Sequence, residues 1–230
     1  MKKTKLLIFD IDGTLIDSVS GYHEVIINAM NDLGIEEIDR NFNTLKHHTD
    51  SYALKYNYEN FFNKELPVSL LNNFEILILK YLKQQPRTIA INGVAKVLSK
   101  LKDSEYAIAF ATGSLPESAI LKMNSAGLEM DAAVLATSKT SFSREGFVLE
   151  AIEKAKNYYD VSEFEQIISV GDGIWDLKTA QNLNLEFIGI GAKNKAVMGA
   201  NGMQHWFEDF TDFIVPLFKK ISIPSTRRED

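Results

Sequence analysis

The chain has 230 residues, of which 45% are hydrophobic and 24% charged, and it contains no cysteine. This composition is typical of a globular protein, and the length suffices for one large domain or for one domain with a smaller module. The lack of cysteine excludes disulfides, thiolate nucleophiles and cysteine-based metal sites. The net charge of −6 argues against a nucleic-acid-binding surface.

The N-terminal segment only partly resembles an export signal. Lys2, Lys3 and Lys5 precede an apolar run, but Asp10 and Asp12 interrupt that run too early for a signal peptide. No stretch approaches the roughly 20 apolar residues that a membrane span requires. We therefore expect a cytoplasmic monomer or weak homodimer that binds neither nucleic acid nor a membrane.

The apolar run Leu6–Phe9 is followed directly by Asp10, Asp12 and Gly13. Such a run predicts a strand that is buried on both faces. Burying unpaired carboxylates is costly, so we place the two aspartates at the carboxyl end of the strand, where open α/β sheets bind ligands. At ~4 Å and an effective dielectric constant of ~20, two such charges repel by roughly 4 kcal/mol. They therefore favour Mg²⁺ as a partner; the alternative is an Asx-type turn with solvated carboxylates.

Residues 18–86 have a helical pattern without any strand pattern. Ser18 is expected to cap a helix that ends at Leu33. Further helices are predicted over residues 51–62 and 68–83. Because this segment separates the first strand from the next core element, we interpret it as an inserted, all-helical cap domain.

From residue 87 onward, helical and strand patterns alternate. Helices are predicted at 94–102, 116–126, 147–158, 174–182 and 210–219, and strands at 106–111, 132–135, 166–170 and 186–190. This alternation implies right-handed crossovers and a parallel sheet with helices on both faces. The predicted fold is therefore α/β: a three-layer, Rossmann-like core formed by residues 1–17 and 87–230, with residues 18–86 as the helical cap.

Three of the predicted strands end in polar triplets. The triplets are Asp10-Ile11-Asp12, Thr112-Gly113-Ser114 and Gly171-Asp172-Gly173. The carboxyl ends of parallel strands share one edge of the sheet, so we expect the triplets to converge on one site. Each triplet suits phosphoryl transfer, since Thr112 offers a hydroxyl and Gly113 an unobstructed N–H to a phosphate oxygen.

The second and third triplets also carry helix-start signals. Ser114 and Glu117 have the spacing of a capping box, which places an anion-favouring helix N-terminus beside the second triplet. The alternative role for Ser114 is a helix cap alone. Asp172 and Asp176 lie four residues apart and so share a helix face. They either interact with the helix dipole or join Asp10 in binding a divalent cation, and we favour the cation.

These motifs resemble those of the haloacid dehalogenase superfamily, in the same order and over nearly the whole chain. The segment 10–14 is the most specific of them, Thr112 after a strand is weaker, and the segment 171–176 is intermediate. The helical insertion is similar to the cap of phosphoglycolate-phosphatase-like and β-phosphoglucomutase-like members. The resemblance implies Mg²⁺-dependent hydrolysis of a small phosphorylated metabolite, a phosphomonoester, through an aspartyl-phosphate.

The resemblance also implies roles for the four aspartates. Asp10 would be the nucleophile, and Asp12 would protonate the leaving oxygen and then activate water. Mg²⁺ would be held by Asp10, by the backbone carbonyl of Asp12 and by Asp172. Asp176 would bind it through water or orient its neighbours.

The phosphate-binding cation departs from the family pattern. The third motif of the family usually contains a lysine that is often followed by proline, but no Lys-Pro occurs near residue 140. Arg144 lies where the lysine falls by spacing and could bind bidentately, so we favour it over the second candidate, Lys139. Together with Thr112, Gly113 and Ser114, this cation would hold the phosphoryl oxygens.

Two other functions stay open at this point. A phosphosugar mutase would use the same residues but would return the phosphoryl group to another hydroxyl. A catalytically silent protein that binds a phosphometabolite would explain the missing Lys-Pro. A dehalogenase is disfavoured because that branch lacks the second aspartate, which is Asp12 here.

Several residues near these motifs receive weaker assignments. His47 and His48 are sequence neighbours whose side chains would point apart on a helix, so we do not expect a metal-binding pair. His23 and Trp175 are expected to pack, although Trp175 could instead cover the site.

Overall fold

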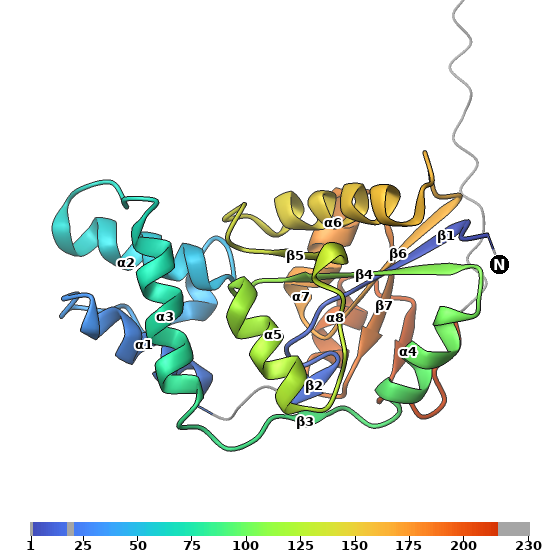
Figure 1. Ribbon diagram of the computed structural model, residues 1–230, viewed down its shortest axis with the longest axis horizontal. Helices are drawn as coiled ribbons and strands as arrows, with labels where there is room; N and C mark the ends of the chain where they lie inside the picture. Colours follow the sequence, from blue (N-terminus) through green and yellow to red (C-terminus); the bar gives the residue numbers. More distant parts are fainter. Residues whose placement is uncertain (1, 18–20, 216–230) are drawn as a thin grey trace, which may run out of the picture.

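The computed structural model describes residues 2–17 and 21–215. Six strands form its main sheet: β1 (Lys5–Phe9), β4 (Tyr106–Thr112), β5 (Leu135–Thr137), β6 (Gln166–Gly171), β7 (Glu186–Ile190) and β8 (His205–Phe207). Their order is β5-β4-β1-β6-β7-β8, and every neighbouring pair is parallel (Figure 1).

Helices cover both faces of this sheet. They are α4 (Val94–Lys102), α5 (Pro116–Ser125), α6 (Arg144–Tyr159), α7 (Ile174–Asn182) and α8 (Lys195–Ala200). In Figure 1, α6 lies above the sheet and α4 and α5 lie below it. The predicted parallel, Rossmann-like α/β fold is therefore confirmed. No helix in the described part of the chain is both long enough and apolar enough to cross a membrane.

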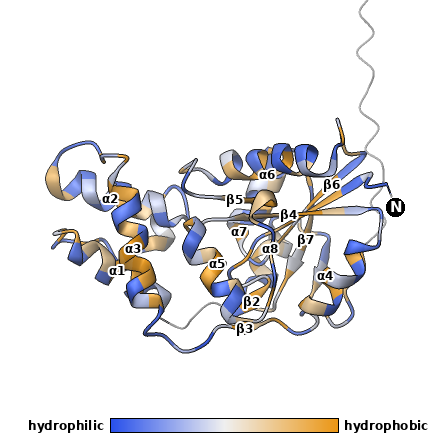
Figure 2. Cartoon of the chain, viewed as in Figure 1, coloured by the Kyte–Doolittle hydropathy of each residue, from blue (hydrophilic) through white to orange (hydrophobic). Residues whose placement is uncertain are grey.

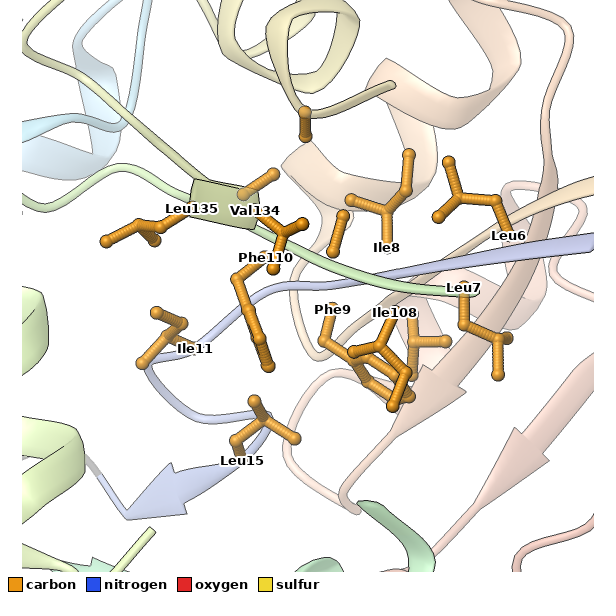
Figure 3. Close-up of a cluster of buried hydrophobic side chains, with 14 of the residues drawn as sticks. Leu6, Leu7, Ile8, Phe9, Ile11, Leu15, Ile108, Phe110, Val134 and Leu135 are labelled. Carbon is orange, nitrogen blue, oxygen red and sulfur yellow. The ribbon is translucent and has the colours of Figure 1, made fainter. Parts of the chain in front are cut away.

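The central strand β1 is buried on both faces, as its uniformly apolar sequence predicts. Leu6, Leu7 and Phe9 are 0% exposed and Ile8 is 1% exposed. Figure 3 shows Leu6 and Ile8 on one side of the strand and Leu7 and Phe9 on the other. The helices around the sheet alternate hydrophilic and hydrophobic residues along their length (Figure 2). Because β1 is central, the residue that follows Phe9 emerges in the middle of the sheet edge.

The sheet register brings the three polar strand ends level with one another. Phe9 pairs with Phe110 on β4 and with Val170 on β6, so the chains leave the sheet at nearly the same height. The N–H group of Asp10 donates to the carbonyl of Val170 at 2.9 Å and continues the ladder by one step. The predicted convergence of the triplets follows from this register.

Three helices lie together beyond the carboxyl ends of the strands, at the left of Figure 1. They are α1 (Tyr22–Asp32), α2 (Asp50–Phe62) and α3 (Leu70–Leu82), here called the cap helices. Their apolar faces form a second hydrophobic cluster that includes Val25, Leu54 and Phe74. Leu115 of the core also belongs to this cluster, so the cap helices pack directly against the loop after β4. The exact domain boundaries stay predictions.

Several short elements were not predicted from the sequence pattern. An antiparallel pair, β2 (Ile16–Asp17) and β3 (Ile89–Ala90), forms where the chain leaves and rejoins the core. Strand β8 and helix α8 were also not predicted, because three and six residues are too few to show a period.

Some predicted boundaries were wrong. The strand predicted over 132–135 begins as a 3₁₀ turn, because the Asp131 carboxylate accepts the N–H of Ala133, and the strand itself is β5. Helix α1 begins at Tyr22 after Gly21, whereas Ser18, the expected cap, lies outside the described residues. Residues 210–215 are not helical, and the rest of the helix predicted there lies outside the described residues.

Candidate active site

The carboxylates of Asp10, Asp172 and Asp176 come together at the edge of the sheet. One oxygen from each lies within 4.8 Å of the others, a spacing that suits three ligands of one metal ion. Asp10 and Asp176 are buried and Asp172 is half-buried. The structure thus places the nucleophile predicted after β1 beside both aspartates predicted after β6.

The electrostatic balance of these carboxylates is unfavourable without an added cation. Burial, reinforced by the charge of Asp176, raises the pKa of Asp10 well above its usual range, although Arg144 opposes this shift. The same two causes raise the pKa of Asp172 to about 7. Oδ1 of Asp172 is buried and has no hydrogen-bond partner among the described residues. An oxygen-only set with an orphaned carboxylate oxygen fits a hard divalent cation such as Mg²⁺.

Gly13 makes the close approach of the first and third motifs possible. Its φ is +81°, a conformation that side chains rarely adopt. A Cβ atom at this position would overlap the carboxylate of Asp172. The glycine of the first motif is therefore required both by its backbone angle and by the position of a candidate metal ligand.

Asp176 has two roles that the sequence left as alternatives. Its Oδ2 accepts the N–H of Gly173 at 3.0 Å and so caps helix α7, of which Asp176 is the third residue. Its Oδ1 accepts a hydrogen bond from Arg144. Asp176 therefore both starts the helix and belongs to the acidic cluster.

Arg144 is the cation that faces this cluster. Helix α6 begins at Arg144, three residues before the predicted start, because the Ser143 hydroxyl accepts the N–H of Gly146 and caps the helix. The buried guanidinium donates from Nη2 to Asp10 Oδ1 at 2.9 Å and to Asp176, and from Nη1 to the carbonyl of His48. This bridging geometry uses the planar fork that distinguishes arginine from lysine.

Lys139 lies away from the acidic cluster. Its Nζ pairs with Oε2 of Glu75 on cap helix α3 at 3.1 Å. Glu75 also accepts the N–H of Glu117 at 2.7 Å, so a cap carboxylate covers the N-terminus of α5. The predicted capping box of Ser114 and Glu117 was therefore wrong: the residue before α5 is Leu115, whose own side chain cannot cap, and the carboxylate at this helix end is that of Glu75.

The loop after β4 lies directly beneath the cap. The N–H of Ser114 donates to the buried hydroxyl of Thr112 at 3.1 Å, which closes the turn. The carbonyl of Gly113 accepts the N–H of Asp50 at 2.9 Å, and a Cβ atom on Gly113 would lie 2.6 Å from the carbonyl of His48. Glycine is thus needed at position 113 to let the cap backbone approach.

Asp12 has its own set of partners, which come from this loop and from helix α5. The Nζ of Lys122 donates to both carboxylate oxygens of Asp12, at 2.7 and 2.6 Å. The Ser114 hydroxyl donates to Oδ2 of Asp12 at 2.9 Å and accepts from Lys122 at 2.8 Å. Ser114 is therefore not a helix cap; its hydroxyl links Asp12 to Lys122. Lys122 is a site residue that the sequence analysis missed.

A cavity of about 710 Å³ lies between the acidic residues and the cap helices. Asp10, Asp12 and Asp172 line its floor. Its walls include His23 and His48 from the cap and Trp175 and Lys193 from the core. This volume exceeds that of a phosphate group, so the cavity can hold a phosphorylated small molecule.

The aromatic residues near this cavity mostly pack, as expected. Trp175 stacks on His48, with ring centroids 4.5 Å apart and an angle of 22° between the planes, and also lines the cavity. His23 meets the ring of Phe42 edge-on at 5.0 Å. No histidine belongs to a group of potential metal ligands in the described ranges.

The parallel sheet, the inserted helices and the acidic edge together define a class of protein. The chain belongs to the haloacid dehalogenase-like hydrolases, whose family model matches residues 7–190. The resemblance seen in the sequence motifs is thereby confirmed. A comparison with curated proteins finds no match.

Several solved structures share the fold. One is a hydrolase from Pseudomonas syringae, with 19% identity and a TM-score of 0.65 over 92% of this chain and 95% of that chain. Another is a β-phosphoglucomutase from Clostridium difficile, with 18% identity and a TM-score of 0.63 over 93% and 94% of the two chains. CbbY from Rhodobacter sphaeroides in complex with phosphate has 15% identity and a TM-score of 0.61 over 89% and 94%. At these identities the likeness shows the fold alone.

Proposed function

We propose that the protein is a Mg²⁺-dependent phosphatase that hydrolyses a small phosphomonoester in the cytoplasm through an aspartyl-phosphate on Asp10. The observation that carries the proposal is the cluster of Asp10, Asp172 and Asp176 with the Arg144 guanidinium and with one carboxylate oxygen that has no hydrogen-bond partner among residues 2–17 and 21–215. Membership of the hydrolase family and the cavity above the cluster support it.

The first half-reaction forms the covalent intermediate. A carboxylate oxygen of Asp10 attacks the phosphorus atom, and the bond from phosphorus to the ester oxygen breaks. Asp12 donates a proton to that departing oxygen, so that an alcohol leaves. Arg144 holds Oδ1 of Asp10 at 2.9 Å and thereby orients the nucleophile for attack.

The second half-reaction restores Asp10. Asp12, now a carboxylate, takes a proton from a water molecule, whose oxygen attacks the phosphorus atom. The bond between phosphorus and Asp10 breaks and inorganic phosphate leaves. Asp12 regains its proton for the next cycle, so the same side chain serves as acid and then as base.

The remaining residues bind rather than react. Asp10, Asp172 and the backbone carbonyl of Asp12 would hold the divalent cation, with Asp176 beside them. The bound cation would supply positive charge that offsets the repulsion between Asp10 and a phosphate dianion. Thr112 and Gly113 would bind the phosphoryl oxygens, together with Arg144. Ser114, predicted to join them, instead uses its N–H and hydroxyl on Thr112 and Asp12.

The experiment is a panel of small phosphoesters assayed for phosphate release with Mg²⁺ and with EDTA. We expect release that requires Mg²⁺ and is lost in Asp10→Asn. Activity that Asp10→Asn leaves unchanged would contradict the proposal, as would a panel without any turnover.

A phosphosugar mutase is the second candidate, because one structure with the same fold is a β-phosphoglucomutase. Incubation with a hexose 1-phosphate separates the two functions. Free phosphate as the product indicates the hydrolase, whereas the hexose 6-phosphate indicates the mutase.

A further inference from the structure

Lys122 is a lysine buried almost completely beside the predicted acid–base residue. Its side chain is 2% exposed, whereas that of Asp12 keeps 25% of its surface exposed. The ammonium group donates to both oxygens of Asp12 and to the Ser114 hydroxyl. These bonds occupy its three protons, which is the full donor capacity of a lysine.

Two residues of the cap, Tyr22 and Asp50, lie on the other side of the Lys122 ammonium group. The ring of Tyr22 lies 4.2 Å from the lysine nitrogen and covers it on the cap side. The hydroxyl of Tyr22 donates to Asp50 at 2.6 Å, and Asp50 also accepts the N–H of Leu115 at 3.3 Å. The charged groups around Lys122 are therefore Asp12 on the core side and Asp50 on the cap side.

A purely structural role does not account for this arrangement. Taking an ammonium group out of water costs several kcal/mol, and well-packed apolar residues often replace buried ion pairs at no loss of stability. Ser118 and Ala119, one turn earlier on α5, and Leu115, just before the helix, are all fully buried, so an apolar side chain would suit position 122. The ammonium group instead defines one orientation of the Asp12 carboxylate through two short bonds.

We propose that Lys122 is a positioning residue for Asp12, which it holds in the orientation needed for proton transfer to and from the substrate. The inference rests on the proposed phosphatase function. General acid catalysis requires the donor to lie within hydrogen-bond reach of the leaving oxygen, so a carboxylate free to rotate loses much of its effect. Ser114 provides the second fixed contact of Asp12.

The test uses two substrates that differ in their need for a proton. An alkyl phosphate releases an alkoxide that must be protonated, whereas p-nitrophenyl phosphate releases a stable phenolate. For Lys122→Met we expect kcat/KM for the alkyl phosphate to fall by about 100-fold, within the range of general acid catalysis. For p-nitrophenyl phosphate we expect a fall of about 3-fold or less, because departure of that leaving group does not depend on Asp12.

A rescue experiment separates the charge of Lys122 from the volume of its side chain. The chain contains no cysteine, so Lys122→Cys introduces a unique thiol. Alkylation of the unfolded variant with 2-bromoethylamine, followed by refolding, restores an ammonium at nearly the position of the lysine nitrogen. We expect it to recover most of the alkyl phosphate activity. Wild-type protein taken through the same steps serves as the reference, and it keeps the rescue informative if Lys122→Met does not fold.

Lys154→Met is the matched control. Lys154 bonds to the carbonyl of Leu135 and pairs with Glu150 away from the acidic edge, so the ratio of the two kcat/KM values should not change. An equal loss on both substrates in Lys122→Met, or a greater loss on p-nitrophenyl phosphate, would overturn the inference while the phosphatase function stands. If the wild type hydrolyses neither substrate, the proposed function fails and the inference fails with it.

Discussion

A cluster of three carboxylates and the separate carboxylate of Asp12 lie at the same edge of the sheet and differ in how their negative charge is balanced. On one side, Asp10, Asp172 and Asp176 share one guanidinium, that of Arg144. On the other side, Asp12 has an ammonium of its own, from Lys122, and a hydroxyl. We call them the aspartate cluster and the Asp12 pair.

The aspartate cluster has an excess of negative charge that a bound cation would balance, whereas the charge of Asp12 is already balanced by Lys122. In the aspartate cluster, the pKa values of Asp10 and Asp172 are raised and one carboxylate oxygen has no hydrogen-bond partner in the described part of the chain, so added positive charge is favoured there. The Asp12 pair is satisfied within the protein. We infer that the chain leaves the metal-binding side unbalanced and fixes the acid–base side in advance, which is the preorganisation expected of a site for electrostatic catalysis.

The largest expected effect belongs to the aspartate cluster. Asp10→Asn removes the proposed nucleophile, and we expect kcat/KM for phosphate release to fall by about 10⁴-fold or more. Steady-state phosphate release measures this loss. Asp32→Asn, at the last residue of α1 and outside the cavity lining, is the control and should keep activity within about 2-fold, since surface substitutions have small effects. A residual rate above one-tenth of wild type in Asp10→Asn would show that the cluster is not the reaction centre.

Disrupting the Asp12 pair should lower the free energy of unfolding. Lys122→Met leaves the Asp12 carboxylate without its cation, and we expect the free energy of unfolding in urea to fall by about 3 kcal/mol, the low end for breaking a buried pair, because Asp12 is partly exposed. Adding Asp12→Asn should restore about 1–2 kcal/mol, since the two residues interact directly. Additive losses in the double variant would show that the pair does not act as a unit.

Most of the fold and the aspartate cluster were predictable from the sequence because their signals are local. The apolar run before Asp10 requires a strand buried on both faces, and alternating helices and strands require a parallel sheet. The ends of parallel strands meet at one edge whatever lies between them in the sequence, so Asp172 could be placed beside Asp10 across about 160 residues of chain.

The Asp12 pair was not predictable in the same way, because its members come from separate elements. Position 122 lies on the buried face of α5 with Ala119 and Met123, and a lysine on such a face was the available signal. The sequence does not indicate which carboxylate this lysine contacts, because the contact depends on how α5 packs against the sheet and the cap. Likewise, Glu75 pairs with Lys139 and accepts a hydrogen bond from the N-terminus of α5 because α3 packs on α5. No local sequence pattern predicts that packing.

A metal-free stability measurement sharpens the contrast between the two groups. The pKa of Asp172 is raised to about 7, so the folded state favours its protonated form and loses stability as the pH rises from about 4 to 7. At pH 8 in EDTA, we expect Asp172→Asn to be more stable than the wild type by about 2 kcal/mol, and at pH 5 the gap should be smaller.

Mg²⁺ should reverse this order. Binding to the folded state stabilises by mass action, so Mg²⁺ should raise the melting temperature of the wild type at pH 8 and have little effect on Asp172→Asn. A melting temperature that Mg²⁺ raises equally in both proteins would place the cation away from Asp172.

The smallest effect comes from Asp50, which faces the Asp12 pair from the cap. Burial raises the pKa of Asp50 to about 6, partly offset by Lys122 and by the Tyr22 hydroxyl. A raised carboxyl pKa means that the folded state loses stability as the pH rises from about 4 to 6. Asp50→Asn can accept the same two hydrogen bonds through its amide oxygen, so its free energy of unfolding relative to wild type should rise by about 1 kcal/mol between pH 4 and pH 7.

Asp32 provides the control of opposite sign for this pH dependence. Hydrogen bonds from Lys80 and Tyr81 lower the pKa of Asp32, so its carboxylate stabilises the folded state above the pKa of the unfolded chain and loses that effect as the pH falls. Asp32→Asn should therefore lose stability relative to wild type as the pH rises, whereas Asp50→Asn should gain it. Urea unfolding of Asp50→Asn between about pH 4 and pH 7, and of Asp32→Asn between about pH 2.5 and pH 5, measures the two slopes. Slopes of equal sign would mean that Asp50 is not held as a buried carboxylate between Tyr22 and Leu115. The cap would then not cover the Asp12 pair through the contact between Tyr22 and Lys122.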